Sequence, residues 1–216
     1  QVVKGTLRNH GMKATFMAKP FASLPGSGMH LHLSLYDNQG ENLLAPKNSK
    51  KLNQAVSGIL DLMPESMIFC APHANSYHRF EENSYAPINA TWGKDNRTTA
   101  LRIPSGNEDS TRIEHRLSGA DANPYLVMAA VLAGIHHGLT ARATPDPAIV
   151  GNAYDQNPSE PPTPAEAFAA FAAARHLDRY IGGDFRAVHL ACLRAEHDRF
   201  ESHITPFERD QYLASS

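Results

Sequence analysis

Two histidines and a serine alternate with leucines directly after a glycine-rich turn. The segment reads Gly26-Ser27-Gly28-Met29-His30-Leu31-His32-Leu33-Ser34. Strict alternation of polar and apolar residues is the period of a β-strand, so His30, His32 and Ser34 share one face. Neutral imidazole binds divalent metals, although two histidines are too few to make a zinc site. The alternative is an ordinary half-buried strand whose polar face meets solvent.

A second segment of period two, residues 111–117, places a carboxylate between two arginines. Arg112, Glu114 and Arg116 point to one side of the expected strand, and the residues between them point to the other. An exposed ladder of alternating charges is the alternative interpretation, and such a ladder contributes little stability.

Arginines are concentrated in the middle of the chain, in a window whose single lysine is Lys94. They are Arg79, Arg97, Arg102, Arg112 and Arg116. The planar guanidinium fork suits carboxylates and phosphates. Together with the histidines and Glu114, these arginines favour an enzyme that handles metal ions and phosphate. The sequence has no GxxxxGK[ST] loop, no HExxH and no G-x-S-x-G, so any nucleotide is held without a P-loop. A zinc hydrolase remains an alternative on the His-x-His pattern alone.

The elements that must position these residues form an α+β pattern. Strands are predicted at Lys13–Pro20, from His30 to about Tyr36, at Ile88–Trp92, at Thr99–Ile103 and at Thr111–Leu117. Helices are predicted at Gln1–Asn9, Lys51–Leu62, from Asp121 to about Gly138, and from Asp184 to about His203. The shared period of the strands predicts a mainly antiparallel sheet with His30, Arg102, Arg112 and Glu114 on its concave face and helices behind it.

The C-terminal third contains a proline-rich connection followed by helices. Residues 144–164 are rich in proline and polar residues, which predicts an ordered surface loop. Thr163 and Thr205 each begin a capping box with proline at the first helical position. The helix that starts near Asp121 is apolar almost all round, which predicts that it is buried.

Composition is typical of a globular protein. The chain has 216 residues, 42% of them hydrophobic, and a net charge of −2. This charge gives no reason to expect nucleic acid or a membrane surface as a partner. The two cysteines, Cys70 and Cys192, form no framework and indicate a reducing compartment, which predicts a cytoplasmic location. The apolar run from Leu126 to Ile135 is too short to span a bilayer, and no signal peptide is expected.

Four long motifs resemble the C-terminal catalytic domain of the glutamine synthetase superfamily. They are GSGMHLHLS, ANSYHRF, APINATWGKDNRTTALRIP and RIEHRLSGADANPYLVMAA, in the family's order. Within that family, the Trp92-Gly93 pair, the helix start SGADANPYLVMAA and the tail segment GDFRAVHLACLRAEHDRF resemble the γ-glutamylpolyamine synthetase branch. The resemblance covers nearly the whole chain.

The resemblance implies a role for each matched residue. His30 and Glu114 match metal ligands, and Arg97 matches the catalytic arginine that stabilises the transferring phosphoryl group. The nucleotide-binding positions are His32, Ser34, Arg102 and Arg112. The positions that bind glutamate are Gly26, Arg79 and Arg116.

The implied reaction is the ATP-dependent ligation of the glutamate γ-carboxylate to an amine or polyamine through a γ-glutamyl phosphate, with Mg²⁺ or Mn²⁺ as cofactor. Metal ions and arginines offset the negative charge of such an intermediate. The family's other metal ligands precede the residues matched here, so we expect the chain to be a piece of a longer, ring-forming homo-oligomer and to be inactive alone. We divide it into a catalytic sheet region, 1–143, and a connection with a helical tail of the same domain, 144–216.

One position departs from glutamine synthetases. Where those enzymes have a glutamate that binds and deprotonates ammonium, this chain has Tyr85 in the segment Glu81-Glu82-Asn83-Ser84-Tyr85-Ala86-Pro87. Tyrosine is neutral at pH 7, and its ring can line a pocket for an alkyl chain or attract a second ammonium group. Tyr85 is therefore our candidate for the amine site, unless it only packs the loop or Glu82 replaces the missing glutamate.

Two alternatives stay open: a glutamine synthetase that uses ammonium, and a family member that is structural or regulatory without catalysis. The presence of every matched arginine, of His30 and of Glu114 argues against the second.

Overall fold

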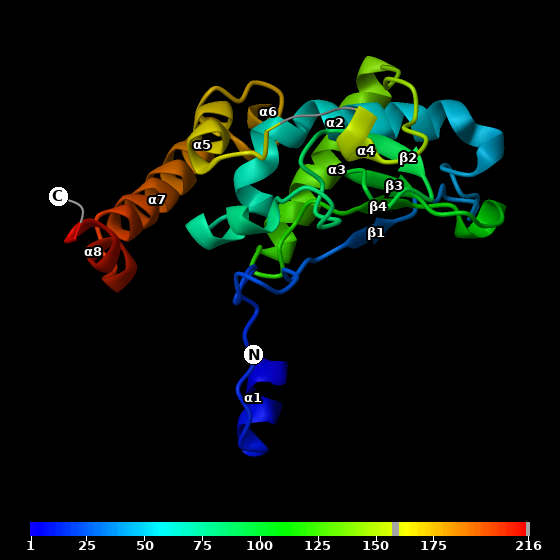
Figure 1. The fold of residues 1–216 in the computed structure, drawn as a ribbon. Coiled ribbons are helices and arrows are strands. Elements are labelled where there is room, and N and C mark those ends of the chain that lie inside the picture. Colours follow the sequence, from blue (N-terminus) through cyan, green and yellow to red (C-terminus); the bar gives the residue numbers. More distant parts are fainter. Residues whose placement is uncertain (157–159, 215–216) are drawn as a thin grey trace.

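The structure, a computed structural model, describes residues 1–156 and 160–214, and its centre is a small sheet covered by helices (Figure 1). The strands lie in the order β1-β4-β3-β2. β1 (Leu31–Leu33) and β3 (Leu101–Ile103) both pair antiparallel with β4 (Ile113–His115), while β2 (Trp92–Lys94) pairs parallel with β3. The fold is α+β with a mainly antiparallel sheet, as the sequence predicts.

The register of the sheet brings the polar residues of three strands to one face. Glu114 on the central strand lies opposite His32 on one side and Arg102 on the other. Residues that are directly opposite in neighbouring strands point to the same face of a sheet. The other face is apolar: Leu101 and Ile113 are fully buried.

Helices α2 (Ser49–Cys70) and α3 (Pro124–Ala141) pack closely on each other through glycines. A Cβ atom added to Gly58 would lie 2.1 Å from the carbonyl oxygen of Gly134, and one added to Gly138 would lie 1.9 Å from that of Gln54. Only glycine allows the two backbones to approach so closely. The helix predicted at Lys51–Leu62 is confirmed but continues past Pro64, because its second half is also buried in the core.

α3 begins where the sequence predicts, with the Asn123 side chain accepting a hydrogen bond from the Tyr125 backbone N–H. It is not buried all round, however: Tyr125, Met128 and Leu132 are exposed along one side. Among the described residues α3 is the one helix that is long and apolar enough to cross a membrane. Buried core helices pass the same test, so this is a weak indication.

The C-terminal helices extend away from the sheet (Figure 1). α5 (Pro164–Ala172) and α8 (Pro206–Tyr212) both begin with the predicted capping boxes, and α7 (Gly183–Glu201) confirms the helix predicted from Asp184 to about His203. The predicted loop across 144–164 contains one short helix, α4 (Ala153–Gln156), and residues 157–159 of that loop lie outside the described part. α6 (Asp178–Ile181) connects α5 to α7.

The remaining elements are short. α1 (Val2–Asn9) projects from the body of the molecule (Figure 1). The 3₁₀ helices are η1 (Pro46–Asn48), η2 (Ala74–Arg79) and η3 (Glu108–Ser110).

Two predicted strands are wrong. Residues 13–20 form no strand, because the backbone of Lys19 bonds to the Asn75 side chain and the carbonyl of Ala18 bonds to the Ser27 N–H. The strand predicted at Ile88–Trp92 instead begins at Trp92, since Trp92, Gly93 and Lys94 are the residues that pair with β3. The strand predicted to reach Tyr36 ends at Leu33, and a single bridge joins Tyr36 to Asn42 beyond it.

Candidate active site

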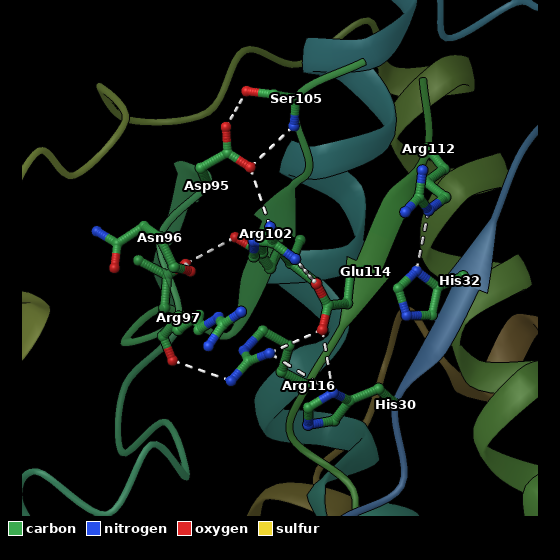
Figure 2. Close-up of polar contacts among 12 residues, drawn as sticks. His30, His32, Asp95, Asn96, Arg97, Arg102, Ser105, Arg112, Glu114 and Arg116 are labelled. Atoms are coloured by element: carbon green, nitrogen blue, oxygen red, sulfur yellow. Dashed lines mark hydrogen bonds and ion pairs between the residues drawn. The ribbon is translucent and has the colours of Figure 1, made fainter. Parts of the chain in front are cut away.

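The carboxylate of Glu114 is the centre of the polar cluster on the sheet (Figure 2). One oxygen accepts a hydrogen bond from Arg102 at 2.7 Å, and the other accepts one from Arg116 at 2.7 Å and lies 3.0 Å from Nδ1 of His30. Glu114 is only 3% exposed. A buried carboxylate is stable in such a place only if charged or polar groups surround it, as they do here.

The two arginines determine the protonation state of Glu114. Burial by itself would raise the pKa of this carboxyl, but the hydrogen bond from Arg102 and the charge of Arg116 outweigh it, so the pKa lies below its ordinary value. The same hydrogen bond from Arg102 to Glu114 raises the pKa of that guanidinium. The cluster is therefore an ionised carboxylate held between two permanent cations.

Asp95, which was not among the predicted site residues, supports Arg102. Asp95 accepts a hydrogen bond from Nη2 of Arg102 at 3.0 Å and another from the backbone N–H of Ser105 at 2.8 Å (Figure 2). Asp95 directly follows β2 and has a φ of 50°. This left-handed conformation is uncommon for a residue other than glycine, and the turn after β2 imposes it. No local signal distinguishes it from an ordinary turn aspartate.

His30 provides a second potential ligand beside the carboxylate. Burial and then the nearby charge of Arg116 lower its pKa, so the ring is neutral at pH 7. With Nδ1 directed at Glu114, a neutral ring leaves Nε2 as the free acceptor, and this atom lies beside Gly28.

A neutral imidazole and a carboxylate fit two positions of a divalent metal site. Within residues 1–156 and 160–214, no group of three or more His, Cys, Asp or Glu side chains could hold a metal. Because two guanidinium groups already contact Glu114, a cation there requires further anionic ligands.

Three of the four predicted nucleotide-binding residues lie together along β1 and the start of β4. Nε of Arg112 donates to Nδ1 of His32 at 3.1 Å (Figure 2). The hydroxyl of Ser34 donates to the carbonyl of Thr111 at 3.4 Å. Arg102, on the neighbouring strand, turns toward Glu114 instead of toward His32. The structure thus brings His32, Ser34 and Arg112 together and places Arg102 in the Glu114 cluster.

The predicted glutamate-binding residues surround a hollow of about 400 Å³, here called the inner hollow. It is lined by Gly26, Gly28, His30, Arg79, Ser84, Tyr85, Ala86 and Arg116. Arg79 is buried, and burial lowers its pKa. A Cβ atom on Gly26 would lie 2.7 Å from the Arg79 side chain, so glycine is required for the two to fit. Gly28, Ser84 and Ala86 are lining residues that sequence reasoning missed.

Two loop residues complete the site. Arg97 is exposed, its side chain points toward Arg116 (Figure 2), and its carbonyl accepts a hydrogen bond from Nη2 of Arg116 at 3.0 Å. Tyr85 is 60% exposed and has a φ of 60°, which is rare for a residue other than glycine. Backbone strain of this kind often occurs at functional sites. The carboxylate of Glu81 pairs with Lys19 at 3.1 Å, so its charge is partly offset.

Comparisons with known proteins identify the family to which the chain is similar. Residues 1–212 match the family model described as the catalytic domain of glutamine synthetase. The chain is 43% identical over 220 residues to the gamma-glutamylputrescine synthetase PuuA of Escherichia coli (strain K12), covering 100% of this chain and 47% of that protein. It is 38% identical to the gamma-glutamylethanolamide synthetase GlnA4 of Streptomyces coelicolor (strain ATCC BAA-471 / A3(2) / M145), covering 92% of this chain and 43% of that one.

Solved structures resemble the chain as well. An ADP complex of a protein named GmaS superposes with a TM-score of 0.86 at 31% identity, covering 98% of this chain and 52% of that one. The chain therefore spans about half the length of the proteins that it matches.

Proposed function

This chain belongs to the glutamine synthetase family, and from that premise we propose that the whole protein joins the γ-carboxylate of glutamate to an organic amine at the expense of ATP. The observation that carries the proposal is the ionised Glu114 held between His30, Arg102 and Arg116 on one face of the sheet. Positive groups arranged in advance around a reacting anion are what transfer of a phosphoryl group requires.

Unsatisfied donors support a role in binding phosphate and carboxylate groups. Within the described part of the chain, the buried Nε atoms of Arg102 and Arg116 have no hydrogen-bond partner. A buried donor without a partner costs about 1–3 kcal/mol, so an oxyanion that accepts from it gains that amount. Phosphate and carboxylate oxygens are the natural acceptors for arginine.

The proposed reaction has two steps. A γ-carboxylate oxygen of glutamate attacks the terminal phosphorus of ATP, and ADP leaves. The amine nitrogen then attacks the acyl carbon of the γ-glutamyl phosphate, inorganic phosphate leaves, and the nitrogen releases a proton. Arg79 and Arg116 hold the glutamate carboxylates in the inner hollow, and Arg97 stabilises the phosphoryl group in transit.

ATP binds along β1 and β4 in this proposal, where His32, Ser34 and Arg112 lie close together. His30 and Glu114 would hold a divalent metal ion, Mg²⁺ or Mn²⁺, together with phosphate oxygens and further ligands. When bound, such an ion neutralises charge that builds up on the phosphates. The zinc hydrolase alternative lacks a third ligand among the residues that the structure describes.

The nucleophile is an organic amine, and Tyr85 supports this choice. A phenol, with a reference pKa of about 10, neither attracts an ammonium ion nor takes its proton well at pH 7. The two curated relatives described above are named for putrescine and ethanolamide products, which also favours an organic amine. The whole protein is proposed to be a cytoplasmic, ring-forming homo-oligomer. The inactivity of the 216-residue chain alone and the division at residue 143 stay predictions.

The test measures phosphate release by the whole protein with ATP, glutamate and one nucleophile at a time. We expect kcat/KM for at least one organic amine to exceed that for ammonium clearly. Equal values would make the protein an ordinary glutamine synthetase. No release with any nucleophile, in a folded protein that contains its metal, would favour the non-catalytic alternative.

A further inference from the structure

A second hollow shares Tyr85 with the inner hollow. This outer hollow has a volume of about 430 Å³ and is lined by Tyr85, Lys94, Asp95, Asn96, Arg97, Thr98, Ala148, Ile149, Val150 and Gly151. Tyr85 is the residue that lines both hollows. The volume is within the range of small-molecule sites, roughly 300–1,000 Å³.

The outer wall of this hollow comes from residues 148–151 of the proline-rich connection, within a segment that continues to Tyr154. This segment is fastened to the loop that carries Arg97: Asn96 donates from its side chain to the carbonyls of Ile149 and Gly151 at 3.2 and 2.8 Å. The backbone N–H of Ala153 donates to the Thr98 hydroxyl at 2.9 Å. The wall and the Arg97 loop are therefore one bonded unit.

The same segment is fastened to the loop that carries Tyr85. The buried hydroxyl of Tyr154 donates to the carbonyl of Ala86 at 2.8 Å. The side chain of Asn152 donates to that of Asn83 at 3.3 Å. Ile149–Tyr154 thus bridges the two loops that flank the reacting groups in the proposed function.

We propose that the outer hollow is the subsite for the alkyl chain of the amine and that residues 148–151 are the specificity-determining wall, held in place by the bonds of Asn152, Ala153 and Tyr154. This inference rests on the proposed function, because it needs an amine that attacks a glutamyl group in the inner hollow. The aromatic ring of Tyr85 and the aliphatic side chains of Ala148, Ile149 and Val150 provide apolar surface for methylene groups. Each methylene that is removed from water strengthens binding roughly fourfold.

Val150 gives the sharpest test because it lines the hollow yet is 83% exposed. Substitutions at an exposed site of this kind usually change stability little. In the whole protein, Val150→Trp should narrow the hollow and reduce kcat/KM for butylamine and for 1,4-diaminobutane about tenfold. The values for ammonium and the KM for glutamate should not change. Val150→Leu should also reduce kcat/KM for these two amines, by a smaller factor.

Val188→Trp is the matched control, since Val188 is 65% exposed on α7, one of the C-terminal helices that extend away from the sheet (Figure 1). This variant should leave kcat/KM unchanged for every nucleophile. The subsite would be overturned if the ratio of kcat/KM for butylamine to kcat/KM for ammonium did not change in either Val150 variant, whether both values stayed the same or both fell equally. Neither result would affect the proposed ligase. Failure of the unmodified protein with every nucleophile would instead overturn the proposed function itself.

Discussion

The floor of the site and its rim are built in opposite ways. The floor consists of Arg102 on β3, Glu114 on β4 and Arg116 directly after β4, and ion pairs join the two arginines to Glu114. The rim consists of Tyr85 and Arg97, which are exposed on loops and are held through their backbones. Burial and charge determine the geometry of the floor. The backbones of the rim accept hydrogen bonds from Arg116 of the floor, and residues next to the rim are bonded to a third segment, residues 149–154.

This difference predicts how substitutions behave. A buried, paired charge contributes to both stability and chemistry, because removing one partner leaves the others uncompensated. An exposed side chain can contribute to the chemistry with little effect on folding. Variants of the whole protein can test whether the two regions separate in this way.

The largest effect is expected for Glu114→Gln. Losing the carboxylate leaves Arg102 and Arg116 without their shared anion and should destabilise the fold by about 3–5 kcal/mol. Phosphate release should fall by about 10³-fold, as expected when a preorganised electrostatic site is disrupted. Denaturant unfolding and the coupled assay measure the two losses. Glu201→Gln, an exposed change at the end of α7, is the control. Full stability in Glu114→Gln would contradict our description of the floor.

Lowering the pH should destabilise the fold through His115, which lies on the apolar face of the sheet. His115 is 3% exposed, and burial, with a small contribution from His30, lowers its pKa to about 4. The unfolded chain has a histidine pKa near 6.5 and so binds more protons between these values, which means that stability falls as the pH falls from about 6.5 to 4. The loss attributable to His115 approaches about 3 kcal/mol.

Stability curves against pH can isolate this contribution. His115→Leu should flatten the curve between pH 6.5 and 4 relative to the unmodified protein. His203→Leu, at an exposed position in the tail, should leave its slope as it was. An equal slope in the unmodified protein and in His115→Leu would show that His115 does not titrate as a buried group.

Arg97→Ala should separate chemistry from stability. Because its side chain is exposed, the midpoint of thermal unfolding should not change. The kcat should fall by about 10²-fold if the guanidinium stabilises the phosphoryl group in transit. Arg142→Ala, exposed at the end of α3, is the matched control. A drop in unfolding midpoint comparable to that of Glu114→Gln would remove the distinction between floor and rim.

The smallest effect is expected for Tyr154→Phe. It removes one buried hydrogen bond to Ala86, which contributes about 1 kcal/mol. The looser loop should raise the KM for the amine severalfold and leave the KM for glutamate unchanged. Tyr180→Phe also loses a hydrogen bond, to His136, but far from the site. Equal changes in both Michaelis constants would mean that Tyr154 only stabilises the fold.

Local patterns in the sequence predicted much of the floor. Period-two alternation placed Arg112, Glu114 and Arg116 on one face because neighbouring side chains of a strand always point to opposite sides. The capping boxes at Thr163 and Thr205 were equally reliable, since their hydrogen bonds span only three residues.

Tertiary structure decided what depends on partners distant in the chain. Residues 13–20 have strand-like composition, but Asn75 and Ser27 take their backbone groups. Which residues of 88–94 form β2 depends on where β3 pairs, a choice that composition does not contain.

The contacts around the rim likewise could not be predicted from local sequence. Nothing local links Tyr154 to Ala86, or Asn96 to Gly151, because these contacts exist only after the connection has folded across two loops. The sequence alone thus determined which residues could do the chemistry and which face each occupies. Only the folded chain brought Asp95 to Arg102 and the proline-rich connection to the rim, because hydrogen bonds between distant segments are selected by packing and not by periodicity.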